Sequence, residues 1–188
     1  DPEVIGFERA MESGGPVDAL VRMKDEGLAA HIGISGGPVG MLERFVETGL
    51  FEALVTHNRW TLLDRSAGRL LDAATARGMG ITNAAPFGAG ILTGDPRFAG
   101  SYGYRPSRPE VAESLATIER LCAEAGVSLA AAALQFSVRD PRIHSTIVGA
   151  SDVSRFAESI GWLDEDVPDG LWTELDAAAP PLSSALDA

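Results

Sequence analysis

A short apolar run that ends in small residues, STIVGASDVSRFAES (residues 145–159), carries the clearest chemical signal in the sequence. The pattern predicts a strand that ends at Gly149 and a helix that begins near Ser151. Free backbone N–H groups and a partial positive charge at a helix N-terminus attract anions, and small residues let a phosphate approach the backbone. Arg155, one turn into the helix, could pair with that anion. An ordinary helix start, with Ser151 or Asp152 as the N-cap, also explains these residues.

Polar residues follow three other apolar runs, at the points where predicted strands end. Ser35 stands before two glycines, and His57 and Asn58 follow a second run. Asn83 ends the third run. In barrels of parallel strands, ligands bind where the strands end, so these side chains are candidates for ligand contacts. Ser35 could instead cap the next helix, and a single His is more often structural than catalytic.

The sequence contains none of the common short catalytic or metal-binding motifs. No nucleophile elbow or paired-carboxylate motif is present, and His31, His57 and His144 are too far apart to form a metal-ligand pattern. The single Cys122 lies in no motif, which predicts a buried structural thiol. These patterns therefore assign no metal ligand and no nucleophile.

The composition and the net charge indicate which kinds of partner the protein can have. The chain has 188 residues and a formal net charge of -12, which argues against a nucleic acid or an anionic membrane as the partner. No apolar run approaches the ~20 residues of a membrane span, no signal-peptide pattern is present, and one cysteine cannot form an internal disulfide. We therefore predict a cytoplasmic protein that acts on a small molecule. Because the first residue is Asp1 rather than Met, we interpret the chain as truncated or processed.

Helical and strand-like patterns alternate along the chain. Apolar spacing and glycine stops predict helices over 17–26, 39–47, 66–77, 110–124, 129–138, 153–160 and 169–177. The short apolar runs predict strands over 31–35, 53–56, 79–83 and 145–148. The Gly- and Pro-rich residues 86–108 predict a functional or mobile loop, and residues 180–188 a frayed tail.

The predicted strands are too apolar to have a wet face, which indicates parallel strands covered by helices. An open doubly wound sheet and a (β/α) barrel both meet that description. No G-x-G-x-x-G follows any strand, which weakens the dinucleotide-fold version of the open sheet. A full barrel needs eight strands and ~250 residues. We therefore predict a single partial domain over 1–188, with about four strands, that forms the C-terminal half of a (β/α)8 TIM barrel.

Three segments taken together resemble the aldo-keto reductases: GLAAHIGISGG, THNRWTLLDRSAGRLLDAATARGMGITNAAPFGAGILTG and LAAAALQFSVRDPRIHSTIVGASDVSRFAES. The resemblance covers roughly residues 1–179 in the correct order. HNRWTLLDR and the opening DPE look most like the sugar-oxidising branch of L-fucose, D-threo-aldose and galactose dehydrogenases. The resemblance implies a (β/α)8 barrel and hydride transfer between NAD(P)H and a carbonyl or hydroxyl carbon of a sugar or related alcohol or aldehyde.

The resemblance also implies which residues contact the nicotinamide and the pyrophosphate. Ser35 and His57 match the positions that hold the carboxamide, although Gly36 stands where Asn is usual and His57 where Gln is usual. A neutral His can still donate a hydrogen bond there. Ala84 falls where the family has an aromatic that stacks on the nicotinamide. The loop that lines the pyrophosphate matches Ala85, Phe87 and Gly88.

The adenosine end of the cofactor site corresponds to residues 149–159. Within it, the residues implied to line the site are Gly149, Ser151, Arg155, Glu158 and Ser159. Arg155 matches the arginine that pairs with the 2'-phosphate or stacks on adenine. Gly149 replaces a residue that is Lys in many NADP-preferring members. Loss of that cation should weaken the preference for the phosphate, so we expect use of NAD or of both NAD and NADP.

The family's catalytic Asp, Tyr, Lys and His come from the first half of the barrel, and the His lies just before an Asp-Pro like Asp1-Pro2. We therefore expect the catalytic residues upstream of Asp1 and no turnover from this chain alone. Tyr102 and Tyr104 match no position of the tetrad. Two other interpretations stay open: a non-catalytic fragment that binds a nucleotide or another protein, and a different barrel enzyme that binds a sugar phosphate. The oligomeric state is not predicted.

Overall fold

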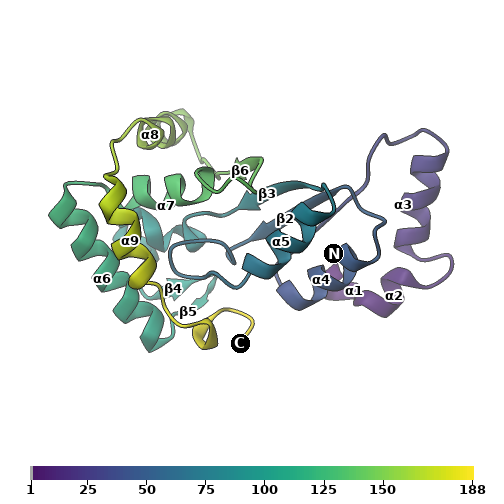
Figure 1. The fold of residues 1–188 in the computed structure, drawn as a ribbon, viewed down its shortest axis with the longest axis horizontal. Coiled ribbons are helices and arrows are strands. Elements are labelled where there is room, and N and C mark those ends of the chain that lie inside the picture. The colour runs from purple at the N-terminus through teal and green to yellow at the C-terminus, as the bar shows by residue number, and fades with distance from the viewer. Residues whose placement is uncertain (1) are drawn as a thin grey trace.

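Within residues 2–188, which the computed structural model describes, four parallel strands form the central sheet in the order β1–β2–β3–β6 (Figure 1). These strands are β1 (Gly33–Gly36), β2 (Ala53–His57), β3 (Gly80–Ala84) and β6 (Ser145–Ile147). The register pairs Ser35 with Val55, and it aligns His57 with Ala84 and Ala84 with Ile147. The carboxyl ends of the strands therefore lie along one edge of the sheet. The predicted parallel α/β fold is confirmed.

The helices are α1 (Pro2–Ile5), α2 (Phe7–Met11), α3 (Pro16–Asp25), α4 (Val39–Glu47), α5 (Gly68–Ala76), α6 (Pro109–Ala125), α7 (Leu129–Val138), α8 (Val153–Leu163) and α9 (Asp169–Ala177). The seven longer ones agree with the predicted helices to within a few residues. The sequence analysis missed α1 and α2, because helices of four and five residues are too short to show a helical period.

The two faces of the sheet have different surroundings. Leu54 and Ile81 are fully buried, and they share one hydrophobic cluster with side chains of α4 and α5. On the opposite face, Ser35 and Ala53 are exposed, and Ile147 is 51% exposed. The prediction that the strands have no solvent-exposed face was therefore wrong. Successive side chains of a strand point to opposite faces, and the helices cover only one of these faces.

The loop over residues 86–108 contains structure of its own. It holds the 3-10 turns η1 (Gly88–Thr93) and η2 (Pro96–Phe98) and a two-stranded hairpin of β4 (Ser101–Tyr102) and β5 (Arg105–Pro106). Tyr102 is 3% exposed, and its hydroxyl donates to the carbonyl oxygen of Asn58 at 2.6 Å. Gly88 has φ +60°, and a Cβ there would lie 2.4 Å from the Tyr102 ring. The buried tyrosine thus anchors the loop against the end of β2.

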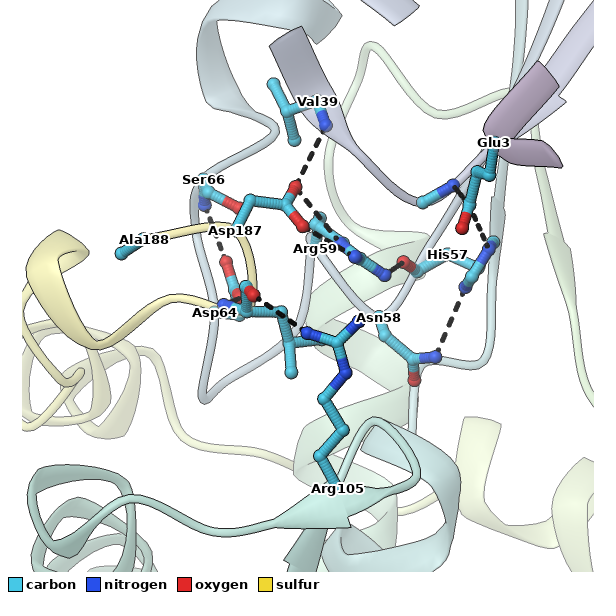
Figure 2. A network of polar contacts seen from close by, with 12 residues as sticks. Glu3, Val39, His57, Asn58, Arg59, Asp64, Ser66, Arg105, Asp187 and Ala188 are labelled. Atoms are coloured by element: carbon cyan, nitrogen blue, oxygen red, sulfur yellow. Dashed lines mark hydrogen bonds and ion pairs between the residues drawn. The ribbon is translucent and has the colours of Figure 1, made fainter. Parts of the chain in front are cut away.

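Residues 180–188 do not fray as the sequence suggested. The residues form the 3-10 turn η3 (Leu182–Ser184), and Ala185 is 6% exposed. Asp187 then pairs with Arg59, which follows β2 (Figure 2). The expectation of a loose tail came from terminal position and composition, which carry no information about partners that lie far away in the sequence.

Candidate functional site

The carboxyl edge of the sheet is held in a strained backbone conformation. Asn58 and Ala85 directly follow β2 and β3, and they have φ values of 58° and 53°. Non-glycine residues in this left-handed region cost about 1–3 kcal/mol each, and they concentrate at functional sites. Backbone hydrogen bonds hold both: Asn58 N donates to Ala84 O and Ala85 N donates to Ile147 O, each at 3.3 Å. This edge is therefore the first place to look for a ligand site.

A groove of about 480 Å³ opens beside the ends of β3 and β6. It brings together residues that the sequence analysis selected from separate segments. Those that line it are Ala85, Phe87, Gly149, Ser151, Arg155 and Ser159. An adjoining pocket of about 690 Å³ also contains Arg155 and adds Glu158. Whether these residues bind a cofactor stays a prediction, but they do share one surface.

Two of the predicted cofactor contacts, Ser159 and Gly88, form hydrogen bonds within the protein. The Ser159 hydroxyl donates to Arg155 O at 2.9 Å. Gly88 is buried outside the groove, where its N–H donates to Ala85 O and its carbonyl accepts from Gly103 N. The Ser159 O–H and the Gly88 backbone groups are therefore used within the protein, while the Ser159 oxygen can still accept a hydrogen bond.

The hydrogen bonds at the start of α8 show that Asp152, rather than Ser151, is the N-cap of this helix. The Asp152 carboxylate accepts hydrogen bonds from Ser154 Oγ at 2.5 Å, Arg155 N at 3.0 Å and Ser151 Oγ at 3.0 Å. These bonds, led by the one from Ser154, lower the pKa of the Asp152 carboxyl to about 2. The helix end is thus capped by the chain itself, and any anion here depends on the Arg155 side chain.

Several groove residues were not predicted. The loop contributes Arg97, Phe98 and Tyr104, and α8 contributes Trp162. The Trp162 ring packs edge-on against Phe87, with 5.3 Å between the ring centroids. The Gly- and Pro-rich composition predicted a functional or mobile loop, but no local signal shows which of its side chains face the groove.

Ser35 and His57 lie farther along the same edge, outside the groove. They sit on adjacent strands and on the same exposed face of the sheet, two positions apart in register. The Asn58 amide nitrogen donates to His57 Nδ1 at 3.3 Å, which leaves the imidazole proton on Nε2. Burial and the nearby Arg59 charge lower the pKa of His57. The lowered pKa favours the neutral imidazole, and its Nε2 lies 3.9 Å from Glu3 Oε1 (Figure 2).

Three other residues that the sequence analysis considered are buried and have structural contacts. Asn83 is fully buried, and its amide donates to Trp60 O and to Ser137 Oγ, each at 2.8 Å. The Tyr102 hydroxyl is enclosed, and burial raises its pKa above the usual range. Cys122 is buried, as predicted, and burial raises its pKa to about 11. None of these three groups faces the groove.

No cluster of potential metal ligands occurs in the part of the chain from Pro2 to Ala188. In the same part, no single helix meets the length and hydropathy expected of a membrane span. Only α6 and α7 together do so, across a bend of 100°.

A groove at the carboxyl edge of a parallel sheet, whose strands alternate with helices, is the place where α/β domains commonly bind ligands. The chain belongs to the aldo/keto reductase family, because the sequence model of that family matches residues 11–180. The predicted family is thereby confirmed.

Three curated relatives are oxidoreductases by name. The chain is 31% identical over 177 residues to the D-threo-aldose 1-dehydrogenase of a Pseudomonas species, which covers 93% of this chain and 53% of that protein. It is 26% identical to the pyridoxal 4-dehydrogenase of Microbacterium luteolum (88% and 49% covered). It is 28% identical to the L-galactose dehydrogenase of Arabidopsis thaliana (79% and 46% covered). The chain thus spans about half the length of the curated relatives it matches.

Solved structures support the fold. The aldo-keto reductase AKR11C1 from Bacillus halodurans, in its holo form, aligns with a TM-score of 0.69. The alignment covers 87% of this chain and 55% of that chain, at 16% sequence identity. Its apo form aligns with a TM-score of 0.67.

Proposed function

We propose that this chain is the cofactor-binding part of an oxidoreductase that moves a hydride between NAD or NADP and a carbonyl or hydroxyl carbon of a sugar or related alcohol or aldehyde. One observation carries the proposal. The residues implied to contact the nicotinamide, the pyrophosphate and the adenosine follow one another along the carboxyl edge. Ser35 and His57 stand at the ends of β1 and β2, Ala85 and Phe87 follow β3, and Arg155 lies on α8 beyond β6.

The chemistry of the groove fits a dinucleotide. The Arg155 side chain is 40% exposed, and its guanidinium can pair with a phosphate. A Cβ at Gly149 would meet nothing within 4 Å, so the backbone there leaves open space. Phe87 and Trp162 supply an aromatic wall. The dinucleotide would supply or accept the hydride, while His57 Nε2 would donate to the carboxamide.

The proton transfer needs residues that this chain does not bring to the edge. The sequence holds one lysine, Lys24, near the end of α3, and it pairs with Glu52, which precedes β2 at the amino end of the sheet. The family's tetrad requires a lysine beside a tyrosine, whereas Tyr102 is buried against Asn58. We therefore expect the general acid–base to come from a segment outside this chain.

We also propose that the sheet is part of a (β/α)8 barrel. β1 and β6 are edge strands of the four-stranded sheet seen in residues 2–188, and one face of that sheet is exposed. In a barrel this face lines the interior. The relatives are about twice as long as the matched region, so they have enough chain for the remaining strands.

A fluorescence titration of the whole chain with NADH and NADPH tests the cofactor site. Gly149→Phe places a ring in the groove without a steric clash at Cβ, and it should weaken binding more than tenfold while the melting temperature stays unchanged. Gly40→Phe is the matched control, because its Cβ would also meet nothing within 4 Å and it lies on α4, away from the groove.

The other two interpretations predict different results. A barrel enzyme specific for sugar phosphates would bind glucose 6-phosphate but neither dinucleotide. A non-catalytic fragment would bind a nucleotide without turnover, or would bind neither kind of ligand if its partner is another protein, and the apolar residues exposed along α8 favour the second version.

A further inference from the structure

Asp95 lies between the loop that follows β3 and helix α8. Its Oδ2 atom is 3.7 Å from Arg155 Nη2, so the carboxylate forms an ion pair with the cation of the adenosine-end pocket. The Asp95 side chain is 19% exposed, and both residues line the same 690 Å³ pocket. Nothing in the sequence pattern links these two positions, which are far apart in the chain.

Asp95 is fixed in place from its own side of the pocket. It caps η2 by accepting a hydrogen bond from Arg97 N at 3.0 Å. Its two carboxylate oxygens also accept from Arg97 Nε at 3.0 Å and Arg97 Nη2 at 2.5 Å. These bonds from Arg97 hold the pKa of the Asp95 carboxyl well below its usual range. Asp95 is therefore a fixed negative charge at neutral pH.

Arg97 and Arg155, two cations around the pocket, each have a carboxylate beside them. Arg97 is bound by Asp95, and Arg155 has Asp95 at its guanidinium and the Asp152 carboxylate at its backbone N–H. Glu158 adds another carboxylate to the lining. A group that enters this pocket therefore meets carboxylates that accept hydrogen bonds.

These carboxylates affect the binding of NAD and NADP differently, because only NADP carries a 2'-phosphate. A 2'-phosphate carries about -1.5 to -2 charges at pH 7. To reach Arg155 it must lie beside Asp95 or displace it, and either outcome is opposed by like-charge repulsion. A ribose 2'-hydroxyl can instead donate a hydrogen bond to a carboxylate, the chemistry by which an acidic residue selects NAD in other dinucleotide sites.

We infer that Asp95 is a specificity-determining residue, which occupies Arg155 and so makes the pocket prefer a ribose 2'-hydroxyl to a 2'-phosphate. This inference rests on the proposed function. It names a residue outside the predicted cofactor contacts, and it assigns the preference to a charge that is present rather than to the missing lysine at Gly149.

A comparison of the binding affinities of the adenosine halves of the two cofactors tests the inference on the whole chain. Adenosine 5'-monophosphate and adenosine 2',5'-bisphosphate are titrated by calorimetry into the wild type and into Asp95→Asn. The asparagine keeps the N-cap of η2 while it removes the charge. We expect the wild type to favour the monophosphate, and Asp95→Asn to shift the affinity ratio toward the bisphosphate by roughly tenfold, the scale of one charge-assisted hydrogen bond.

Two further variants separate the ion pair from general electrostatics. Asp152→Asn also removes a charge near Arg155, but at the backbone N–H, and it should shift the ratio much less. Arg155→Ala added to Asp95→Asn should abolish the gain. If Asp95→Asn leaves the ratio unchanged, or if Asp152→Asn changes it as much, the inference is overturned while the cofactor site stands. If neither nucleotide binds the wild type, the proposed function fails as well.

Discussion

The guanidinium of Arg59 and the carboxylate of Asp187 form a two-point ion pair that ties the C-terminal tail to the end of β2 (Figure 2). The Nη2–Oδ1 and Nε–Oδ2 distances are 2.6 and 3.3 Å. Arg59 is 6% exposed, and Asp187 also accepts from Val39 N, at the start of α4, at 2.9 Å. Arg59 Nη1 in turn donates to His57 O at 3.4 Å. The tail thereby supports the strand end that carries His57.

Asp187→Ala should destabilise the chain by about 2–4 kcal/mol, because it leaves the nearly buried Arg59 charge without its partner. Chemical denaturation followed by circular dichroism measures the difference. Glu124→Gln is the control, because it breaks the exposed Arg120–Glu124 pair on α6 and should cost less than about 0.5 kcal/mol. Equal losses in the two variants would show that the tail contributes nothing specific.

The same pair predicts how stability depends on pH. Burial raises the pKa of the Asp187 carboxyl. Hydrogen bonds from Arg59 and from Val39 N lower this pKa by more than burial raises it, so the net shift is downward. A carboxyl whose pKa is lower in the folded state stabilises the fold above its unfolded pKa of about 3.9, and this stabilisation disappears as the pH falls through the folded pKa. The free energies of unfolding of the wild type and Asp187→Asn should therefore differ at pH 7 and converge only as the pH falls through the folded pKa, which lies below about 3.9. A difference that already disappears above pH 5 would contradict this assignment, because the folded-state carboxyl should still be ionised there.

Asn83 provides a test that separates structure from ligand binding. Its amide, together with Ser137 and Thr146, links β3, α7 and β6 through buried hydrogen bonds of 2.8 Å. Asn83→Ala removes two donated bonds and should cost about 1–3 kcal/mol of stability. Because Asn83 faces the helices rather than the groove, the variant that remains folded at low temperature should bind NADH with unchanged affinity. Weaker binding without loss of stability would return Asn83 to the site.

The alternation of strands and helices could be predicted because each long helix shows its own period, and short apolar runs such as the one around Leu54 leave a local signal. Parallel pairing then places the carboxyl ends of these strands at one edge of the sheet. The tail, the β4–β5 hairpin and the exposed sheet face could not be predicted in the same way. They depend on contacts between distant residues, such as Asp187 with Arg59, or on whether another element covers a face.

The candidate site was predictable to a similar extent. Arg155 and Gly149 stand at a strand–helix junction, where local chemistry suggests an anion. Asp95 and Trp162 could not be selected, because their roles arise only when the loop after β3 folds against α8. The capping role of Asp152 was one of two explanations that the sequence left open, and the hydrogen bonds decided it.

The exposed face of α8 predicts how the chain behaves in solution. Val153, Phe156, Ile160 and Leu163 recur every three or four residues, and they are 83, 60, 47 and 41% exposed. An apolar stripe of this kind on a helix normally packs against another element, so we expect the chain to self-associate at micromolar concentrations. Phe156→Glu should shift the sedimentation profile toward the monomer.

Leu28→Glu is the matched control for this experiment, because Leu28 is 73% exposed but lies outside the stripe. Both variants add one negative charge, so a general effect of net charge would move their sedimentation profiles equally. A wild-type chain that is monomeric at all concentrations would refute the prediction. Addition of a polypeptide that supplies the remaining strands of the proposed barrel should suppress self-association in the wild type, because that segment would cover the same apolar face.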